Sequence, residues 1–150
     1  MSATPPRYIV DASIAIKWLF DDEDFTVEAR NVLLDYQSGR IDLLAPDHLY
    51  HEVLNALRTG VRMERLRPDD AEGAMQDFLS LGVPTVAGPS LFVSGFRTAL
   101  AFDCAFYDGL YLTLADQAGC PLIHADRRLR NTLQGTFPNE RWIEDYTPSS

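Results

Sequence analysis

The stretch FYDGLYLTLADQAGCPLIHADRRL, residues 106–129, holds a helix signal, a strand signal and two acidic residues that border them. Apolar residues recur at helical spacing from Asp108, and Gly119 is a typical residue at a helix end. Residues 121–125 then form an apolar, strand-like run, with Asp126 directly behind it and a short helix expected beyond. A helix that leads straight into a buried strand is typical of α/β domains.

The rest of the chain repeats this alternation. Further strands are expected at residues 7–10, 41–45 and 83–87, with an edge strand near Trp142. Helices are expected in SIAIKWLF from Ser13, after the acidic run DDED up to Gly39, from Pro46 and Asp47 to Gly60, from Pro68 and Asp69 toward Gly82, through residues 92–101, and from Asp108. Strands separated by helices predict parallel strands with right-handed crossovers, so the predicted fold class is α/β.

The composition suits one domain without a membrane span. The chain has 150 residues and 46% hydrophobic content, and no run approaches the roughly 18 apolar residues of a membrane-spanning helix. The N-terminus lacks the basic and apolar segments of a signal peptide. Cys104 and Cys120 both lie in apolar surroundings, which favours two small buried thiols over a disulfide or a metal pair. These features point to the cytoplasm.

The charge balance limits the kind of nucleic-acid surface that the chain can present. With 13 basic and 22 acidic residues the formal net charge is −9, which counts against a large non-specific nucleic-acid surface. A small site where a metal ion carries the positive charge remains compatible with it. Two arginine clusters are each either a solvated face or a local contact surface. They are Arg58, Arg62, Arg65 and Arg67, and Arg127, Arg128 and Arg130.

Four acidic residues border apolar stretches long enough to be core: Asp11, Glu52, Asp108 and Asp126. A carboxylate at the edge of a core is costly unless something pairs with it. In a parallel fold these acids are free to converge near the carboxyl ends of the strands, where they would raise each other's pKa. A divalent cation removes that penalty, and hard oxygen ligands suit Mg²⁺ or Mn²⁺. The pattern therefore predicts metal-assisted phosphodiester chemistry.

Each acid also has an ordinary structural interpretation. Asp11, Asp108 and Asp126 could each cap a helix, with Ser13 as an alternative cap for the first helix. Glu52 could lie on the exposed flank of its helix. The combination of the four, rather than any single member, favours a functional site.

Three segments together resemble the PIN-domain family, and most of all the VapC-type toxins of bacterial toxin–antitoxin pairs. They are IVDASIAIKW at residues 9–18, HLYHEVLNAL at residues 48–57, and the stretch at residues 106–129. Their order and the gap of 18 residues between the last two acids (126 − 108 = 18) carry the resemblance. It implies a single three-layer α/β/α PIN domain over residues 1–150, with a central, mostly parallel sheet of four to five strands and flexible ends at about residues 1–6 and 146–150.

The resemblance also implies an activity and partners. It implies a Mg²⁺-dependent endoribonuclease that hydrolyses phosphodiester bonds in RNA, with Mn²⁺ as an alternative ion. A small antitoxin protein is expected to block the site, and the chain is expected to form a homodimer without membrane association. Helices bearing Trp18, Phe20, Leu54 and Leu57 are expected to offer the antitoxin an apolar surface. The RNA target and the cut site stay open.

Carried over residue by residue, the four family acids match Asp11, Glu52, Asp108 and Asp126. The resemblance ties Asp11 and Asp108 most directly to the metal ion. Glu52 and Asp126 are then further ligands, or act through a water molecule. One metal ion or two are both compatible with this set.

Two further residues are expected to support the site, and the roles of two others near it stay open. Ser13 matches a small hydroxyl residue beside the first acid, and Asn55 matches an Asn that shares a helix face with the family Glu. His124 departs from the family pattern, in which Thr or Ser commonly stands two residues before the last acid; it is interpreted as a polar strand-end residue or an extra ligand. Asp103 competes with Asp108 and is interpreted as a helix-end or loop residue at the rim of the site.

Other functions fit the residues less well. A PIN domain that processes RNA in housekeeping and a catalytically silent PIN binding module are the alternatives within the same fold. A receiver domain requires a late lysine, whereas Lys17 is the only lysine in the chain. A phosphatase of the DxD type requires an Asp where Ser13 stands.

Overall fold

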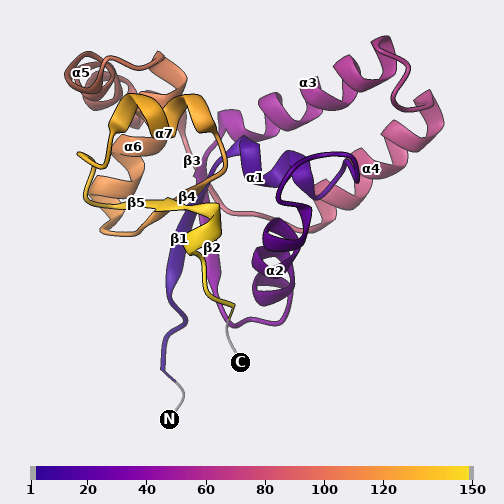
Figure 1. Ribbon diagram of the computed structural model, residues 1–150, viewed down its shortest axis with the longest axis horizontal. Coiled ribbons are helices and arrows are strands. Elements are labelled where there is room, and N and C mark those ends of the chain that lie inside the picture. Colours follow the sequence, from indigo (N-terminus) through magenta and orange to yellow (C-terminus); the bar gives the residue numbers. More distant parts are fainter. Residues whose placement is uncertain (1–2, 149–150) are drawn as a thin grey trace.

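Five parallel strands form the centre of the protein. The computed structural model describes residues 3–148, and its sheet has the order β3-β2-β1-β4-β5 (Figure 1). The strands are β1 (Arg7–Val10), β2 (Asp42–Pro46), β3 (Thr85–Val86), β4 (Leu122–His124) and β5 (Glu140–Trp142), and every neighbouring pair is parallel. The predicted α/β class and parallel sheet are confirmed.

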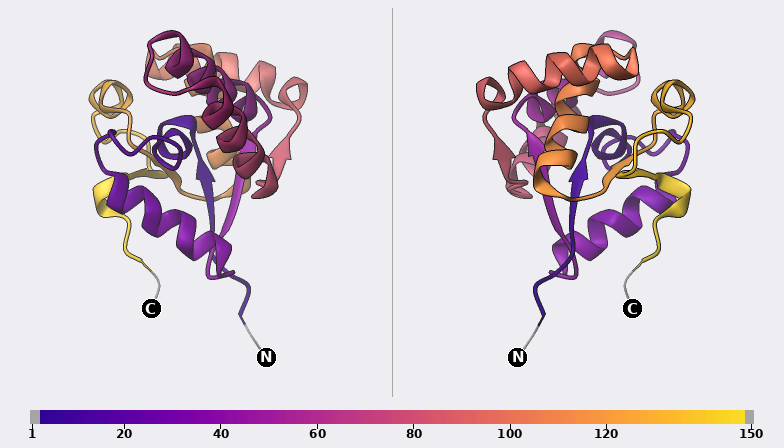
Figure 2. Two further views of the ribbon diagram at one scale, coloured as in Figure 1. Left: turned by 90° about the vertical axis from the view of Figure 1, so that its right-hand side faces the viewer. Right: turned by 90° about the vertical axis from the view of Figure 1, so that its left-hand side faces the viewer.

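Helices cover both faces of this sheet. They are α1 (Ala12–Lys17), α2 (Thr26–Gln37), α3 (His48–Arg62), α4 (Pro68–Ser80), α5 (Phe92–Phe102), α6 (Phe106–Ala118) and α7 (Arg127–Leu133), with short 3₁₀ helices η1 (Gly88–Leu91) and η2 (Ile143–Asp145). Figure 2 shows α2 and α6 on opposite sides of the strands, which gives the three-layer arrangement expected of the chain. Helices α3 and α4 form an arm that projects from the body of the domain (Figure 1).

Two helix boundaries differ from the sequence prediction for packing reasons. Helix α3 continues past Gly60 to Arg62, and a Cβ atom at Gly60 would lie 3.0 Å from the ring of Phe20. This glycine therefore permits close packing instead of ending the helix. Helix α6 begins at Phe106, so Asp108 lies within its first turn and does not cap it. Gly119 ends α6 in the left-handed conformation, as predicted, with φ of 64°.

The main core joins the strands to the helices that cover them, and one polar contact anchors the C-terminal end of the described chain to α2. Ile9, Val10 and Ile123 on the central strands are completely buried. Tyr146 is also buried, and its hydroxyl donates a hydrogen bond to Asp35 of α2. Residues 1–2 and 149–150, which belong to the ends expected to be flexible, lie outside the described residues.

Two expectations from composition concern the cysteines and membrane spans. Cys120 is a buried free thiol, as expected, whereas the free thiol of Cys104 is only half-buried. Within residues 3–148, none of the helices combines the length and the apolar composition needed to span a bilayer.

Helices α5 and α6 approach each other closely at two glycines. A Cβ atom at Gly109 would lie 2.9 Å from the Cβ of Ala99, and closer still to the carbonyl oxygen of Gly95. Because backbone cannot move aside as a flexible side chain can, this contact fixes where α6 and its first-turn residue Asp108 lie.

We expect Gly109→Ala to destabilise the fold by about 1–3 kcal/mol, since the added methyl group overpacks a helix contact. Gly73→Ala on exposed α4, where nothing lies within 4 Å of the added Cβ, is the matched control. It should be neutral or stabilise by about 0.5–1 kcal/mol, because alanine favours helix. Urea unfolding of both variants measures the difference. Equal stabilities for the two variants would contradict the packing argument.

Candidate active site

Asp11 lies directly after β1, and its carboxylate is buried. The side chain is 6% exposed and accepts a hydrogen bond from Ser13 Oγ at 2.5 Å. Asp11 occupies the N-cap position of α1, but its side chain makes no capping hydrogen bond, and Ser13 lies inside the helix, so neither side chain caps α1. Burial raises the pKa of Asp11 to about 8; the Ser13 hydrogen bond acts against this, and the charges of Glu52, Asp126 and Asp108 add to it.

The turn from β4 into α7 holds Asp126 in place. Asp126 Oδ1 accepts hydrogen bonds from the backbone N–H groups of Arg128 at 2.9 Å and Leu129 at 3.2 Å, so this acid does cap its helix. The preceding N–H group, that of Ala125, donates to Ser13 Oγ at 2.8 Å. Ser13 therefore links the first acid to the turn that carries the last one.

Glu52 projects from α3 toward α6. Its Oε1 atom accepts a hydrogen bond from the hydroxyl of Tyr111 at 2.9 Å. Burial, followed by the charge of Glu52, raises the pKa of Tyr111 well above its ordinary value, so the hydroxyl stays a donor. The Glu52 side chain is thus partly exposed, at 39%, and is held in place by the Tyr111 hydroxyl.

His48 is a site neighbour that the sequence analysis missed. It stands one turn before Glu52 on α3, with Nε2 3.1 Å from Glu52 Oε1, and it packs between Tyr107 and Tyr111 with ring centroids at 5.4 and 4.7 Å. The Nε2 contact is close but lacks hydrogen-bond geometry, and both ring nitrogens are buried without a hydrogen bond in the part of the chain that the structure describes. Its spacing of four residues from Glu52 was the available signal.

Asp108 lies in the first turn of α6, where backbone N–H groups and the helix dipole favour a carboxylate. Burial is the main cause that raises its pKa; the charge of Asp126 adds to this, and that of Arg128 opposes it. The guanidinium of Arg128 is 3.7 Å from Asp108 Oδ2, and its side chain is 75% exposed. It partly balances the acids while remaining accessible to solvent.

The four acids interact electrostatically, but they do not form a closed ligand cage. Each of the other three raises the pKa of Asp11, and Asp126 and Glu52 raise that of Asp108. Among residues 3–148, however, no three His, Cys, Asp or Glu side chains stand at metal-ligand spacing. The donor set still fits a hard divalent cation, because all four groups are carboxylates and the charges that raise the pKa of Asp11, the most buried of them, are those of the other three acids.

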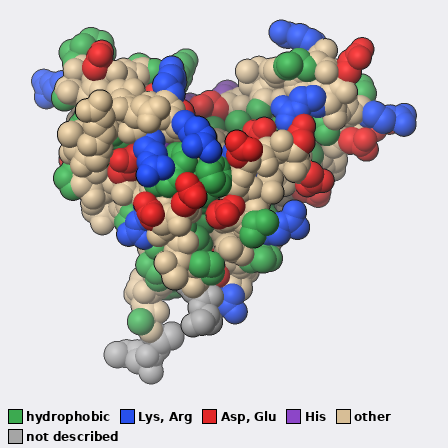
Figure 3. Space-filling view, in the orientation of Figure 1, with side chains coloured by type: hydrophobic (Ala, Val, Ile, Leu, Met, Phe, Trp, Pro, Cys, Tyr) green, Lys and Arg blue, Asp and Glu red, His purple; other side chains and the backbone are tan. Residues whose placement is uncertain are grey.

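The other expected residues lie in different surroundings. Asn55 is exposed on α3. Asp103 is exposed and ends α5 in the left-handed conformation, with φ of 53°, as expected of a helix-end residue. His124 is completely buried and lies 2.7 Å from Glu140. Figure 3 shows acidic and basic side chains mixed over one face of the molecule, in keeping with the net charge and without a continuous basic surface.

Comparison with known proteins places the chain in a family. A family model described as the PIN domain matches residues 8–133. The chain belongs to the PIN-domain family. It is 28% identical over 130 residues to VapC ribonuclease Mb0985 of Mycobacterium bovis, covering 87% of this chain and 94% of that protein. It is 30% identical over 128 residues to ribonuclease VapC3 of Pyrobaculum aerophilum, covering 82% and 92%. The expected resemblance to VapC-type proteins is confirmed.

Solved structures share the PIN fold. PAE2754 from Pyrobaculum aerophilum superimposes with a TM-score of 0.67 at 22% identity, over 95% of this chain and 93% of that one. VapC20 of Mycobacterium tuberculosis, described as a sarcin-ricin loop cleaving toxin, has a TM-score of 0.61 at 15% identity, over 83% and 93%. VapBC2 from Rickettsia felis, solved on a DNA fragment from its promoter, has a TM-score of 0.61 at 10% identity, over 91% and 96%.

The buried Asp11 carboxylate predicts that the metal-free PIN domain loses stability as pH rises. Its folded pKa of about 8 lies above the ordinary 3.8, so its protonated form is favoured by folding. The free energy of unfolding should fall by an amount on the order of a few kcal/mol as pH rises from about 4 to about 8. Asp11→Asn should reduce this dependence strongly and leave the smaller part that comes from the raised pKa of Asp108, whereas exposed Asp103→Asn should retain all of it. Urea unfolding in EDTA across this range tests the effect, and equal pH slopes for wild type and Asp11→Asn would contradict it.

Proposed function

We propose that this PIN domain is a Mg²⁺-dependent endoribonuclease and the toxin of a toxin–antitoxin pair. The observation that carries the proposal is the buried Asp11 carboxylate at the end of β1, which interacts with the charges of Glu52, Asp108 and Asp126. A protein keeps such an arrangement at a cost to its stability, so a functional use is the economical explanation. The ribonuclease names of the curated relatives support RNA as the substrate.

In this proposal Asp11 and Asp108 hold the ion, and Glu52 and Asp126 complete its surroundings directly or through water. A bound Mg²⁺ or Mn²⁺ lowers the pKa of a coordinated water and offsets charge on the scissile phosphate. Ser13 orients Asp11 through its 2.5 Å hydrogen bond, and Tyr111 orients Glu52. The exposed guanidinium of Arg128, 3.7 Å from Asp108, is placed to bind an RNA phosphate beside the site.

A small antitoxin is the proposed inhibitor, supported by the VapBC2 complex among the structural neighbours. The surface predicted to bind the antitoxin needs a correction. Phe20 and Leu57 were expected to be available on it, but Phe20 is only 4% exposed and Leu57 only 1%. An open groove of about 550 Å³ between α3 and α4 remains, lined by Leu54, Val61 and Met75 among others. We propose that an apolar antitoxin segment lies in this groove.

The cytoplasm, where RNA is available, is the proposed site of action.

The outer face of α5 is the proposed homodimer interface. Of the ten large apolar side chains that are exposed within residues 3–148, six lie on α5 and the start of α6. They are Phe92, Val93, Phe96, Leu100, Phe106 and Tyr107. Four of these side chains, Phe92, Val93, Phe96 and Phe106, line one open pocket, and the ring centroids of Phe92 and Phe106 are 5.8 Å apart. A large exposed apolar patch is unusual on a monomer and typical of the central part of a protein interface.

Asp108→Asn tests the catalytic assignment. The fold should persist, because Asp108 does not cap α6, while RNA cleavage should fall about 100-fold or more and Mg²⁺-induced thermal stabilisation should shrink. Asp103→Asn is the matched control and should keep both. Cleavage of total RNA and thermal unfolding with and without Mg²⁺ are the measurements. Undiminished cleavage by wild type in excess EDTA, or loss of activity in Asp103→Asn alone, would refute the assignment.

Phe96→Glu tests the dimer face. Phe96 is 56% exposed on α5, and a charge there should convert the dimer to a monomer, because an unpaired carboxylate would be buried at the interface. Val27→Glu, at a 69% exposed position on α2, should leave the dimer intact. Light scattering after gel filtration gives the molecular mass of each. A monomeric wild type, or a dimer in both variants, would remove α5 as the interface.

A further inference from the structure

The turn that carries Asp126 is supported from the edge strand of the sheet. In the parallel register of β4 and β5, Leu122 pairs with Glu140 and His124 with Trp142. Leu122 and His124 are two residues apart on β4, so their side chains point to the same face of the sheet. Glu140, as the partner of Leu122, lies on that face too. The His124 ring is completely buried, and its Nε2 atom is 2.7 Å from Glu140 Oε2. A histidine at the end of β4 is therefore held by an acid from a different element.

The second ring nitrogen of His124 faces the candidate active site. Nδ1 accepts a hydrogen bond from the backbone N–H of Asp126 at 3.2 Å. An accepting nitrogen has no proton, so the proton of the neutral imidazole is on Nε2 and is donated to Glu140. Hydrogen-bond donation thus runs in one direction, from the peptide N–H of Asp126 to the imidazole and from the imidazole to the Glu140 carboxylate.

We propose that His124, oriented by Glu140, is a positioning residue that fixes the Asp126 peptide and so aims the Asp126 carboxylate toward Asp108 and Asp11. The proposal rests on the proposed nuclease function. Ser13 performs the equivalent task one residue earlier, where its Oγ accepts from the N–H of Ala125 at 2.8 Å. The peptide N–H groups of Ala125 and Asp126 are thereby held by Ser13 of α1 and His124 of β4. His124 is held in turn by Glu140 of β5.

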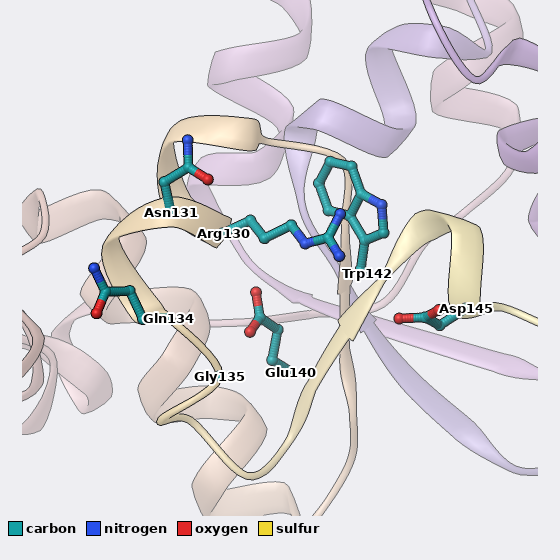
Figure 4. Close-up of a pocket in the computed structure, with 7 residues that line it drawn as sticks. All are labelled: Arg130, Asn131, Gln134, Gly135, Glu140, Trp142 and Asp145. Carbon is teal, nitrogen blue, oxygen red and sulfur yellow. The ribbon is translucent and has the colours of Figure 1, made fainter.

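The surroundings of Glu140 make it a suitable position for substitution. Glu140 lines an open cavity of about 540 Å³ between α7 and β5, which none of the four acids lines. Figure 4 shows the Glu140 side chain in this cavity with Arg130, Trp142 and Asp145. A shorter side chain at position 140 enlarges an existing space, so overpacking does not complicate the result.

Two substitutions at His124 test the roles of its two ring nitrogens separately. The carbonyl oxygen of Asn can take the place of Nδ1, whereas the amide of Gln can take that of Nε2. His124→Asn should keep the contact with the Asp126 peptide but lose the contact with Glu140, so Mg²⁺ affinity and kcat should fall by up to about tenfold, as in Glu140→Ala. His124→Gln should lose about tenfold or more in both, with little change in KM for RNA. Calorimetric Mg²⁺ titration gives the affinity without relying on activity.

Glu140 provides a second test if the His124 variants fail to fold. Glu140→Ala should lower Mg²⁺ affinity and kcat about tenfold, whereas Glu140→Gln, which still accepts from Nε2–H, should restore most of the loss. Asp145→Asn, which removes a charge from the same cavity, should behave like wild type. Wild-type Mg²⁺ affinity and kcat in folded Glu140→Ala would overturn the positioning role and leave the proposed nuclease standing. Absence of both Mg²⁺ binding and cleavage in wild type would overturn the nuclease and the positioning role together.

Discussion

The buried carboxylate of Asp11 is the constraint on which the rest of this PIN domain depends. A charged group removed from water at the end of a central strand is costly, and three further acids nearby increase that cost. Specific polar contacts hold these acids in place. Ser13 donates to Asp11 and accepts from the Ala125 peptide, which ties the ends of β1 and β4 together. The same arrangement leaves a concentration of negative charge that suits a divalent cation.

Each acid is held by a different kind of support. Asp126 is fixed by two helix N–H groups, Glu52 by the hydroxyl of Tyr111, and Asp108 by its place in the first turn of α6. The helices that deliver these residues are themselves packed tightly, as the glycine contact between α5 and α6 shows. Orientation of the acids is thus a property of several elements at once. This is the physical basis for expecting remote residues such as Glu140 to influence the site.

Three regions of the surface differ in chemical character. The site and its neighbouring arginine are polar, whereas the groove between α3 and α4 and the outer face of α5 are apolar. A chain with net charge −9 presents no continuous basic surface for RNA on the face shown in Figure 3. Recognition of RNA in the proposed function therefore depends on local contacts near the site, with the metal ion supplying positive charge.

The sequence by itself determined the α/β class, the strand positions and the order of the acids, because hydrophobic periodicity and strand-end residues are local signals. Whether a residue caps a helix, ends it or packs against a neighbour depends on what lies across the fold. The roles of Gly60 against Phe20 and of Asp108 inside α6 were therefore decided only by tertiary structure. The same holds for the support of the acids: Tyr111 is 59 residues from Glu52, and Glu140 is 16 residues from His124. Such contacts join elements that the sheet order and helix packing bring together, and no local pattern encodes them.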